Sequence, residues 1–359
     1  SFGNPHSDHH RYGRDAAAAV ESARAEIASL IGADPREVVF TSGATESNNI
    51  AIKGAARFVG NQRRHIVTVA TEHKCVLESV RALEIEGFSN TILPVRSNGL
   101  IDLDALDAAI GDDTVLVSVM GVNNEIGVIQ PLRDIGQLCR ARGALFHTDC
   151  AQAVGKIPLD VEEMAIDLMS ITAHKMYGPK GIGALYVRRR PRVRLEPLFS
   201  GGGQERGIRS GTLPAFLCVG FGAAAAAARQ DMSAERERLE SLHTRLKARL
   251  LAIPGARLNG DAEQRWPGNL NVAFPGVDSQ ALLEALVDDI AAATGSACTS
   301  AAVEPSYVLQ AIGLDNSTAA SAIRLGLGRQ TTLEEIDAAA TRIAEAVDAR
   351  QVVARTSAA

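Results

Sequence analysis

Short apolar runs alternate with amphipathic segments over the first two hundred residues, and this alternation restricts the fold more than any other feature. Seven runs have the length and composition of buried strands: 38–40, 65–70, 91–95, 114–119, 144–148, 167–171 and 182–187. Helical spacing of apolar residues occurs at 15–31, 75–86, 103–110 and 132–142. Apolar strands separated by amphipathic helices predict a mostly parallel sheet covered on both faces, which is an α/β fold.

A change of composition near residue 230 predicts a second, smaller domain. Residues 223–228 are all alanine, and residues 235–251 form a charged helical stretch that can bridge two lobes. Beyond it, the segments 269–274, 281–287, 307–312, 323–327 and 333–347 favour an α+β lobe. We therefore predict a large domain over residues 1–230 and a small C-terminal domain over residues 231–359.

The composition is that of an ordinary globular enzyme. The 359 residues are 46% hydrophobic and 22% charged, so the chain can bury a substantial core. A net charge of -5 argues against a general electrostatic role on nucleic acid or on an anionic membrane. The run Arg188–Arg192 is locally basic, and we interpret it as a solvated edge.

Cysteine usage predicts a reducing compartment. The five cysteines are an odd number without C-x-x-C spacing, which fits neither a disulfide framework nor a structural zinc site. The sequence has no apolar run of membrane-spanning length and no signal peptide at its start, so we predict a cytoplasmic protein. A cleaved targeting segment would leave no trace, which keeps the mitochondrial matrix as the alternative.

Lys175 is the first candidate for covalent chemistry. It follows the apolar strand 167–171 and the small hydroxyl residue Thr172, an arrangement that offers an amine to an aldehyde. Such a lysine can form a Schiff base with pyridoxal phosphate. Asp149 ends another strand and could keep the pyridinium nitrogen of that cofactor protonated. Together the two side chains could hold a cofactor that accepts electrons from the substrate.

Two other strand ends carry candidate groups. The turn 41–47 leads from a strand into a helix, so its backbone N–H groups could bind a phosphate, although such turns are often only helix caps. His73 lies just past the strand 65–70, where it is either functional or structural. The histidines at 6, 9 and 10 have no spacing that would fix a metal, and we predict no metal site.

The small domain contributes a thiol and a guanidinium group. Cys298 lies among small and polar residues in 294–302, a setting typical of an exposed, mobile and reactive thiol. Arg324 lies within the apolar strand 322–327. A bidentate grip on a substrate carboxylate would explain it, and an internal salt bridge is the alternative.

Four long motifs resemble the group I cysteine desulfurases of the NifS and IscS type, within the class V aminotransferases. They are FTSGATESNN at 40–49, VNNEIG at 122–127, AHKMYGPKG at 173–181 and GSACTS at 295–300. The resemblance extends over nearly the whole chain. It implies the aspartate aminotransferase architecture known as fold type I, a homodimer and pyridoxal 5'-phosphate.

The resemblance also implies a role for each matching residue. Lys175 would carry the cofactor as a Schiff base, with His73 stacked on its ring and assisting proton transfer. Asp149 would pair with the ring nitrogen and Gln152 with the phenolic oxygen. The remaining contacts would be made by Ala44, Thr45, Thr172, His174 and the partner subunit's Thr212 to the phosphate, and by Asn124 and Arg324 to the substrate carboxylate. Asn124 would also contact the cofactor.

The implied reaction converts L-cysteine to L-alanine and leaves the sulfur as a persulfide on Cys298. The acceptor would be an iron–sulfur scaffold, a tRNA thiolation protein or a nitrogenase assembly factor. Alternatives are transamination or selenocysteine lysis on the same lysine and aspartate, and a catalytically weak sulfur-relay or scaffold subunit. Members usually carry a Y-L-D-x-x-A-T-T-like strand before Phe2. We expect either that this segment precedes Ser1 or that activity is impaired.

Overall fold

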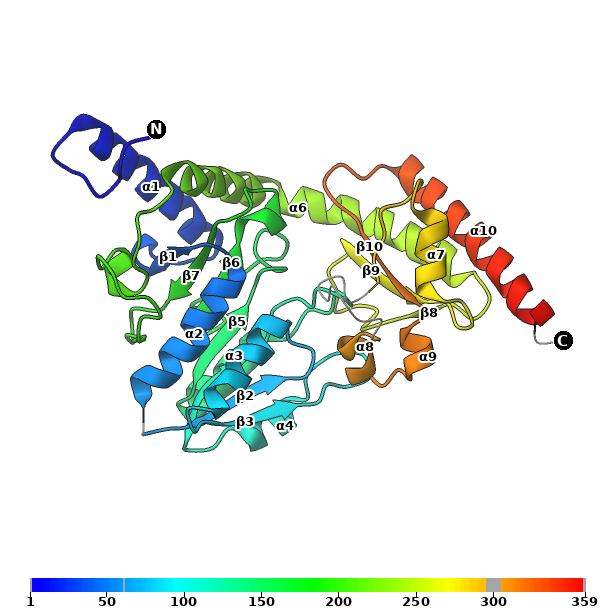
Figure 1. Ribbon diagram of the computed structural model, residues 1–359, viewed down its shortest axis with the longest axis horizontal. Helices are drawn as coiled ribbons and strands as arrows, with labels where there is room; N and C mark the ends of the chain where they lie inside the picture. Colours follow the sequence, from blue (N-terminus) through cyan, green and yellow to red (C-terminus); the bar gives the residue numbers. More distant parts are fainter. Residues whose placement is uncertain (1, 61, 295–304, 358–359) are drawn as a thin grey trace. The chain divides into compact units, whose positions relative to one another are not determined.

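The computed structural model describes residues 2–60, 62–294 and 305–357, with only the backbone of residues 352–357. The chain forms two compact units (Figure 1). The first contains residues 1–93, 102–122 and 130–232, and the second contains residues 94–101, 123–129 and 233–359. Two short segments from the first half of the sequence, 94–101 and 123–129, thus belong to the second unit.

The described residues of the first unit form a seven-stranded sheet in the order β1-β7-β6-β5-β4-β2-β3. Its strands are β1 (Val38–Thr41), β2 (His65–Val69), β3 (Ser89–Leu93), β4 (Thr114–Ser118), β5 (Leu145–Asp149), β6 (Leu168–Thr172) and β7 (Gly183–Val187). The strands from β2 to β6 pair in parallel, whereas β7 pairs antiparallel with both β1 and β6. This confirms the predicted α/β fold with a mostly parallel sheet.

Strand β3 begins and ends two residues earlier than the predicted run 91–95. It is an edge strand that pairs with β2 alone, and Leu93 is its last paired residue. Pro94 follows, and it cannot extend the ladder because it has no N–H group. Val95 instead forms an isolated bridge with Ile101 in the second unit.

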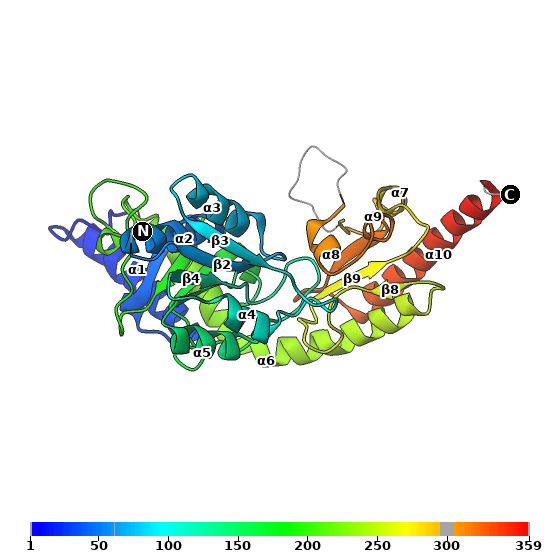
Figure 2. The same ribbon diagram turned by 90° about the horizontal axis from the view of Figure 1, so that it is seen from below.

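Helices cover both faces of this sheet. They are α1 (Arg11–Leu30), α2 (Ala44–Val59), α3 (Lys74–Glu84), α4 (Leu103–Ala109), α5 (Leu132–Arg142) and the first part of α6 (Ala215–Leu251). Figure 2 shows α2 and α3 on one face of the sheet and α4 and α5 on the other. Apolar side chains of α2 and α3, such as Ile52 and Leu83, pack with strand residues such as Ile66 and Leu185 into one fully buried cluster. This packing stabilises the strand ends that carry the candidate residues.

The second unit contains a small antiparallel sheet in the order β10-β9-β8. Its strands are β8 (Arg257–Leu258), β9 (Asn269–Ala273) and β10 (Ala322–Gly326). The remainder of α6 belongs to this unit with α7 (Ser279–Leu286), α8 (Tyr307–Ala311), α9 (Asn316–Ala319) and α10 (Leu333–Ser357). Within the described ranges, every helix is too short or too polar to cross a membrane.

A buried ion pair joins α1 to the loop before α6. Arg24 donates from both terminal nitrogens to the Glu205 carboxylate, at 2.7 and 2.8 Å. Glu205 also accepts the Phe40 N–H at 2.6 Å, and the Arg24 guanidinium stacks 4.7 Å from the centre of the Phe40 ring. Both charged side chains are 4% exposed. The pair therefore stabilises the start of the 205–212 loop against β1.

We expect Glu205→Gln to lower the free energy of unfolding by about 3 kcal/mol, because it leaves the Arg24 guanidinium buried without its main counter-charge. Urea unfolding of the folded protein measures this loss. Glu26→Gln is the matched control, since Glu26 pairs with Arg229 at the surface and should change stability by less than about 1 kcal/mol. Equal effects of the two substitutions would contradict the prediction.

A buried histidine links three neighbouring strands at the centre of the sheet. His147 on β5 is fully buried, and its ring nitrogens lie 2.8 Å from Ser118 Oγ on β4 and 3.0 Å from Ser170 Oγ on β6. Burial lowers the pKa of His147 from 6.5 to about 3. The folded protein therefore keeps this ring neutral at pH values where the unfolded chain binds a proton.

This difference predicts an acid-dependent loss of stability. The contribution of His147 is fully present above pH 6.5 and is lost as the pH falls from 6.5 toward 3. Between pH 6.5 and 5.5 the free energy of unfolding of His147→Gln should fall by about 1 kcal/mol less than that of the unmodified protein. Urea titrations at the two pH values measure this. His9→Gln, which changes an exposed ring, should keep the original pH dependence, and the same dependence in His147→Gln would refute the assignment.

Candidate active site

The Asp149 carboxylate ends β5 and is held from two sides. It is 4% exposed. Its Oδ1 accepts the Ala151 N–H at 2.9 Å, and its Oδ2 accepts from Asn48 Nδ2 at 2.7 Å. Among the described residues no cation forms an ion pair with it. The carboxyl group is thus buried and held in place by two donors, and it can accept a hydrogen bond from a protonated ring nitrogen.

Lys175 lies on the neighbouring strand connection. Asp149 is in register with Ser170 on β6, and β6 runs directly into the 3₁₀ turn Ala173–Met176 that carries Lys175. The turn ends at Tyr177, whose φ of 64° is left-handed. Lys175 is exposed, and within the described ranges its ammonium group makes no hydrogen bond or ion pair. The amine is therefore accessible for chemistry.

The N-terminus of α2 forms an anion cradle with the end of β6. Gly43 is the N-cap of α2 and offers no side chain to the N–H groups of Ala44 and Thr45. A Cβ atom added at Gly43 would lie 3.7 Å from Thr172 Oγ1, which itself lies 3.0 Å from His174 Nδ1. Backbone N–H groups, a hydroxyl and an imidazole therefore converge where the helix dipole favours negative charge.

Cations raise the positive potential of this cradle. The pKa of His174 is lowered, first by partial burial and then by the charges of Lys175, Lys180 and Lys156. Each of these ammonium groups disfavours a further positive charge on the ring. The positive potential of these ammonium groups also favours the binding of a phosphate, because its negative charge offsets theirs.

His73 begins α3 at the carboxyl end of β2. Its Nδ1 caps the helix by accepting the Cys75 N–H at 3.2 Å, and the Cys75 thiol also lies 3.0 Å from Nδ1. Asn48 Nδ2 lies 3.1 Å from the same sulfur. Sequence reasoning missed Asn48 and treated Cys75 as a buried hydrophobe like Cys139, Cys150 and Cys218. The three others are buried, but Cys75 is only partly buried.

Gln152 is oriented by a neighbouring lysine. Lys156 donates to Gln152 Oε1 at 2.6 Å. Because an ammonium group can only donate, the amide oxygen must face Lys156, and the Gln152 NH₂ group is turned to the other side. An NH₂ group suits an acceptor such as a phenolate oxygen. Sequence reasoning selected Gln152 but not Lys156.

The loop with Thr212 is attached to the first turn of α2. Arg209 forms an ion pair with Glu46 at 2.9 Å, and Glu46 also accepts the Ser42 N–H at 2.6 Å. Thr212 itself is exposed. Its side chain is therefore available at the surface of the first unit.

Asn124 and Arg324 lie together in the second unit. Arg324 on β10 donates to the Asn124 carbonyl oxygen at 3.1 Å. Among the described residues Arg324 has no carboxylate partner, so the alternative of an internal salt bridge finds no acid there. Asn124 Oδ1 is buried without a hydrogen-bond partner in that same set. Both side chains retain capacity for a ligand.

Cys298 lies outside the described residues, but the chain on either side of 295–304 is anchored. Ala293 forms a β-bridge with Arg324, with N–H···O distances of 3.2 and 2.7 Å. Ser306 begins α8 and donates to the buried Glu125 carboxylate. The chain before residue 295 is thus held by Arg324, and the chain after residue 304 is held by Glu125, which follows Asn124 in the sequence.

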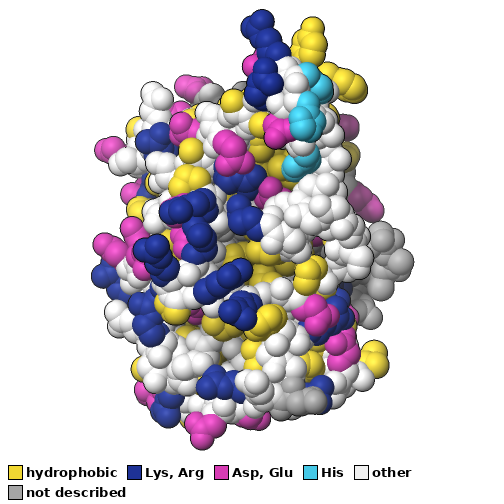
Figure 3. Space-filling view, turned by 90° about the vertical axis from the view of Figure 1, so that its left-hand side faces the viewer, with side chains coloured by type: hydrophobic (Ala, Val, Ile, Leu, Met, Phe, Trp, Pro, Cys, Tyr) yellow, Lys and Arg dark blue, Asp and Glu magenta, His cyan; other side chains and the backbone are white. Residues whose placement is uncertain are grey.

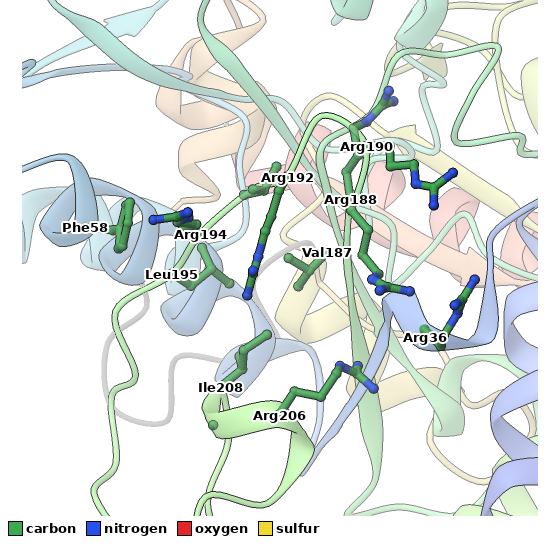
Figure 4. A pocket seen from close by; sticks show the side chains of 13 residues that line it. Arg36, Phe58, Val187, Arg188, Arg190, Arg192, Arg194, Leu195, Arg206 and Ile208 are labelled. Atoms are coloured by element: carbon green, nitrogen blue, oxygen red, sulfur yellow. The ribbon is translucent and has the colours of Figure 1, made fainter.

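Basic side chains gather on the face of the first unit that Figure 3 presents. A cavity of about 580 Å³ opens there, with Val187, Leu195 and Ile208 as apolar lining and arginines around them (Figure 4). Arg188, expected at a solvated edge, is instead 2% exposed and donates to the carbonyl oxygens of Ile166 and Val161. The arginines at 189, 190 and 192 are exposed as predicted, and Arg194 is exposed as well. Their charges favour anions at this face.

Known proteins resemble this chain over most of its length. The family described as Aminotransferase class-V matches residues 1–339. A protein of Rattus norvegicus named cysteine desulfurase is 60% identical over 337 residues, which cover 94% of this chain and 74% of that protein. One of Drosophila melanogaster, named as mitochondrial cysteine desulfurase, is 59% identical over 97% of this chain and 75% of its own length. A solved NifS-like protein superposes with a TM-score of 0.89 at 36% identity, covering 97% of this chain and 92% of its own. These likenesses confirm the predicted fold class and the resemblance.

Proposed function

The chain belongs to the class V aminotransferase family, and from this premise we propose that it is a pyridoxal phosphate-dependent cysteine desulfurase. The observation that carries the proposal is the junction of β5, β6 and α2. There Asp149, the turn carrying Lys175 and an uncapped helix N-terminus lie on adjacent elements. Close relatives that bear the name cysteine desulfurase supply the substrate class.

The residues present fit the cofactor. The carboxylate of Asp149 suits a protonated ring nitrogen, and the NH₂ group of Gln152 suits a phenolate oxygen. The uncapped start of α2 with Thr172 and His174 suits a phosphate. When bound, the cofactor supplies a protonated aromatic ring that accepts electrons from the substrate's α-carbon.

The chain's own side chains would then bind and move protons. Lys175 Nζ is the base that takes the proton from the α-carbon of L-cysteine. His73 Nε2 assists proton transfer. Arg324 and the Asn124 side chain hold the substrate carboxylate. The Asp149 carboxylate would stabilise the protonated ring nitrogen.

Sulfur transfer requires Cys298. Its thiolate attacks the sulfur of the substrate, so that an S–S bond forms as the carbon–sulfur bond of cysteine breaks. The β-carbon gains a proton, and the products are L-alanine and a persulfide on Cys298. A protein acceptor, such as an iron–sulfur scaffold, then takes the sulfur by thiol exchange.

We propose a homodimer on the basis of exposed apolar side chains in the first unit. Tyr177, Phe216 and Val219 are 58%, 66% and 43% exposed. Gly181 and Gly220 bring their two segments together, through Leu217 and Pro179 respectively. A second copy that covers this area would bury these side chains.

We place the enzyme in the cytoplasm, with the mitochondrial matrix as the alternative that the names of several relatives favour.

The test is a product analysis. Purified protein loaded with pyridoxal phosphate is mixed with L-cysteine without any keto acid, and alanine and protein-bound persulfide are measured. We expect equal amounts of the two in the first turnover. Alanine that forms only from pyruvate would identify a transaminase, and the absence of any turnover would favour a scaffold subunit. Either result would overturn the proposal.

A further inference from the structure

Four side chains form a continuous hydrogen-bonded chain that includes two residues of the proposed cofactor site. It runs from Asp149 Oδ2 to Asn48 Nδ2 at 2.7 Å, from Asn48 Nδ2 to Cys75 Sγ at 3.1 Å and from Cys75 Sγ to His73 Nδ1 at 3.0 Å. The chain connects three elements, namely β5, α2 and α3. Its two ends are the residues expected to contact the cofactor ring, Asp149 at the ring nitrogen and His73 on the ring face.

Asn48 is buried at the centre of this chain. It is 0% exposed and lies on α2, next to apolar residues of the core. Among the described residues it is the side chain that donates to the Asp149 carboxylate. Its Oδ1 has no partner in that set, which shows that the amide is oriented by its NH₂ group. A buried amide oxygen without a partner destabilises the fold, so we look for the role of Asn48 in the Asp149 carboxylate that its NH₂ group contacts.

The direction of each hydrogen bond follows from chemistry. A carboxylate can only accept, so Asn48 must present Nδ2 to Asp149, and its second N–H bond then points to Cys75. Burial and the Asp149 charge raise the pKa of Cys75 to about 12, so the thiol keeps its proton. The sulfur therefore accepts from Asn48 and donates to His73 Nδ1.

His73 receives a second donor at the same atom. The Cys75 backbone N–H also points to Nδ1, at 3.2 Å. With two donors facing Nδ1, a neutral ring carries its proton on Nε2. The backbone donor alone favours this tautomer, and the Cys75 thiol that Asn48 holds adds a second donor.

The buried surroundings of Asp149 disfavour a second negative charge next to it. Glu72 is fully buried nearby, and its pKa is raised by burial and by the Asp149 charge. A second negative charge is thus disfavoured beside Asp149. Donors such as Asn48 compensate for the missing cation and favour the ionised carboxylate.

We propose that Asn48 is a positioning residue of the cofactor site, which holds the Asp149 carboxylate directly and helps to stabilise the Nε2–H tautomer of His73 through the Cys75 thiol. This inference rests on the proposed function, since Asp149 and His73 act there on the bound cofactor. Asn48 does not contact the reacting atoms, and it acts through these two side chains.

Asn48→Ser tests this role because it removes the contact to Asp149 without adding a charge. The control is Asn49→Ser, which makes the same change one residue later, where the amide donates to the Thr45 carbonyl oxygen. We expect kcat of Asn48→Ser to fall about 10- to 100-fold with a KM for L-cysteine within about threefold of the original. The control should stay within about twofold for both constants.

Two spectroscopic readouts separate positioning from general damage. With ring-¹⁵N-labelled cofactor, the ring nitrogen should be protonated in the original protein and in the control, and less protonated in Asn48→Ser. In cofactor-free protein with ¹⁵N-labelled histidine, His73 should show the Nε2–H tautomer, and the population of this tautomer should fall in Asn48→Ser because the Cys75 thiol is no longer held by Asn48. If that variant does not fold, Asn48→Ala also removes the contact to Asp149 without adding charge and should show the same changes.

The results distinguish this inference from the proposed function. Unchanged kcat, ring protonation and His73 tautomer in a folded Asn48 variant would overturn the role of Asn48, even if the enzyme is a desulfurase. If the original protein binds no cofactor, the proposed function fails. The cofactor-free His73 signal then still decides the hydrogen-bonded chain, and an unaltered tautomer in the variant would overturn it.

Discussion

Lys175→Ala should lower kcat for alanine formation from L-cysteine by at least about 10³-fold, because it removes the base at the α-carbon. The amine that bonds to the cofactor aldehyde is lost with it. The protein should therefore lose the borohydride-stable attachment of pyridoxal phosphate, although the phosphate cradle and Asp149 remain. Alanine production and the mass of the borohydride-treated protein measure the two effects.

The control for this prediction is Lys247→Ala in the second unit. Lys247 has no place in the cradle, so its variant should retain both activity and covalent attachment. A Lys175→Ala protein that still attaches the cofactor after borohydride treatment would show that another lysine carries it. The assignment of Lys175 would then be wrong, whichever reaction the enzyme performs.

Cys298→Ala should abolish release of sulfide from L-cysteine in the presence of a reductant. Without this thiol no persulfide forms on the protein, while cofactor binding does not depend on it. The absorption band of the bound cofactor should therefore remain, and it should still change when L-cysteine is added. Sulfide assays and visible spectra measure the two properties separately.

Cys139→Ala is the matched control, since Cys139 is buried on α5, next to the segment that leads into the start of β5. Its sulfide release should equal that of the original protein. Sulfide release from Cys298→Ala at the original rate would remove Cys298 from the proposed transfer. The loss of the absorption band in Cys298→Ala would instead show that the substitution affects the site in general.

Much of the fold could be predicted because it depends on local patterns. Apolar strands and amphipathic helices leave a periodic signal along the chain, and parallel strands place their carboxyl ends at one edge of a sheet. This is why Asp149 and Lys175 could be selected together before their contacts were known. In the structure β5 and β6 are parallel neighbours, so Asp149 and the turn with Lys175 lie at the carboxyl ends of adjacent strands.

The signals that were missed concern pairs of distant residues. Arg24 and Glu205 are 181 positions apart, and Asn48 and Asp149 are 101 positions apart. A buried asparagine within an otherwise apolar helix face was a visible hint, but periodicity cannot identify its partner. The role of an inward-facing polar side chain such as Asn48 depends on the group that it contacts in the folded chain.

The sequence by itself therefore determined the α/β class, the family and the chemical identity of the candidate groups, since these follow from local periodicity and from motifs. Only the tertiary structure decided the antiparallel placement of β7, the membership of 94–101 and 123–129 in the second unit, and the hydrogen-bonded chain through Asn48. The physical reason is that these features depend on side chains and backbone segments that meet only when the chain is packed, where burial makes each unpaired polar group costly.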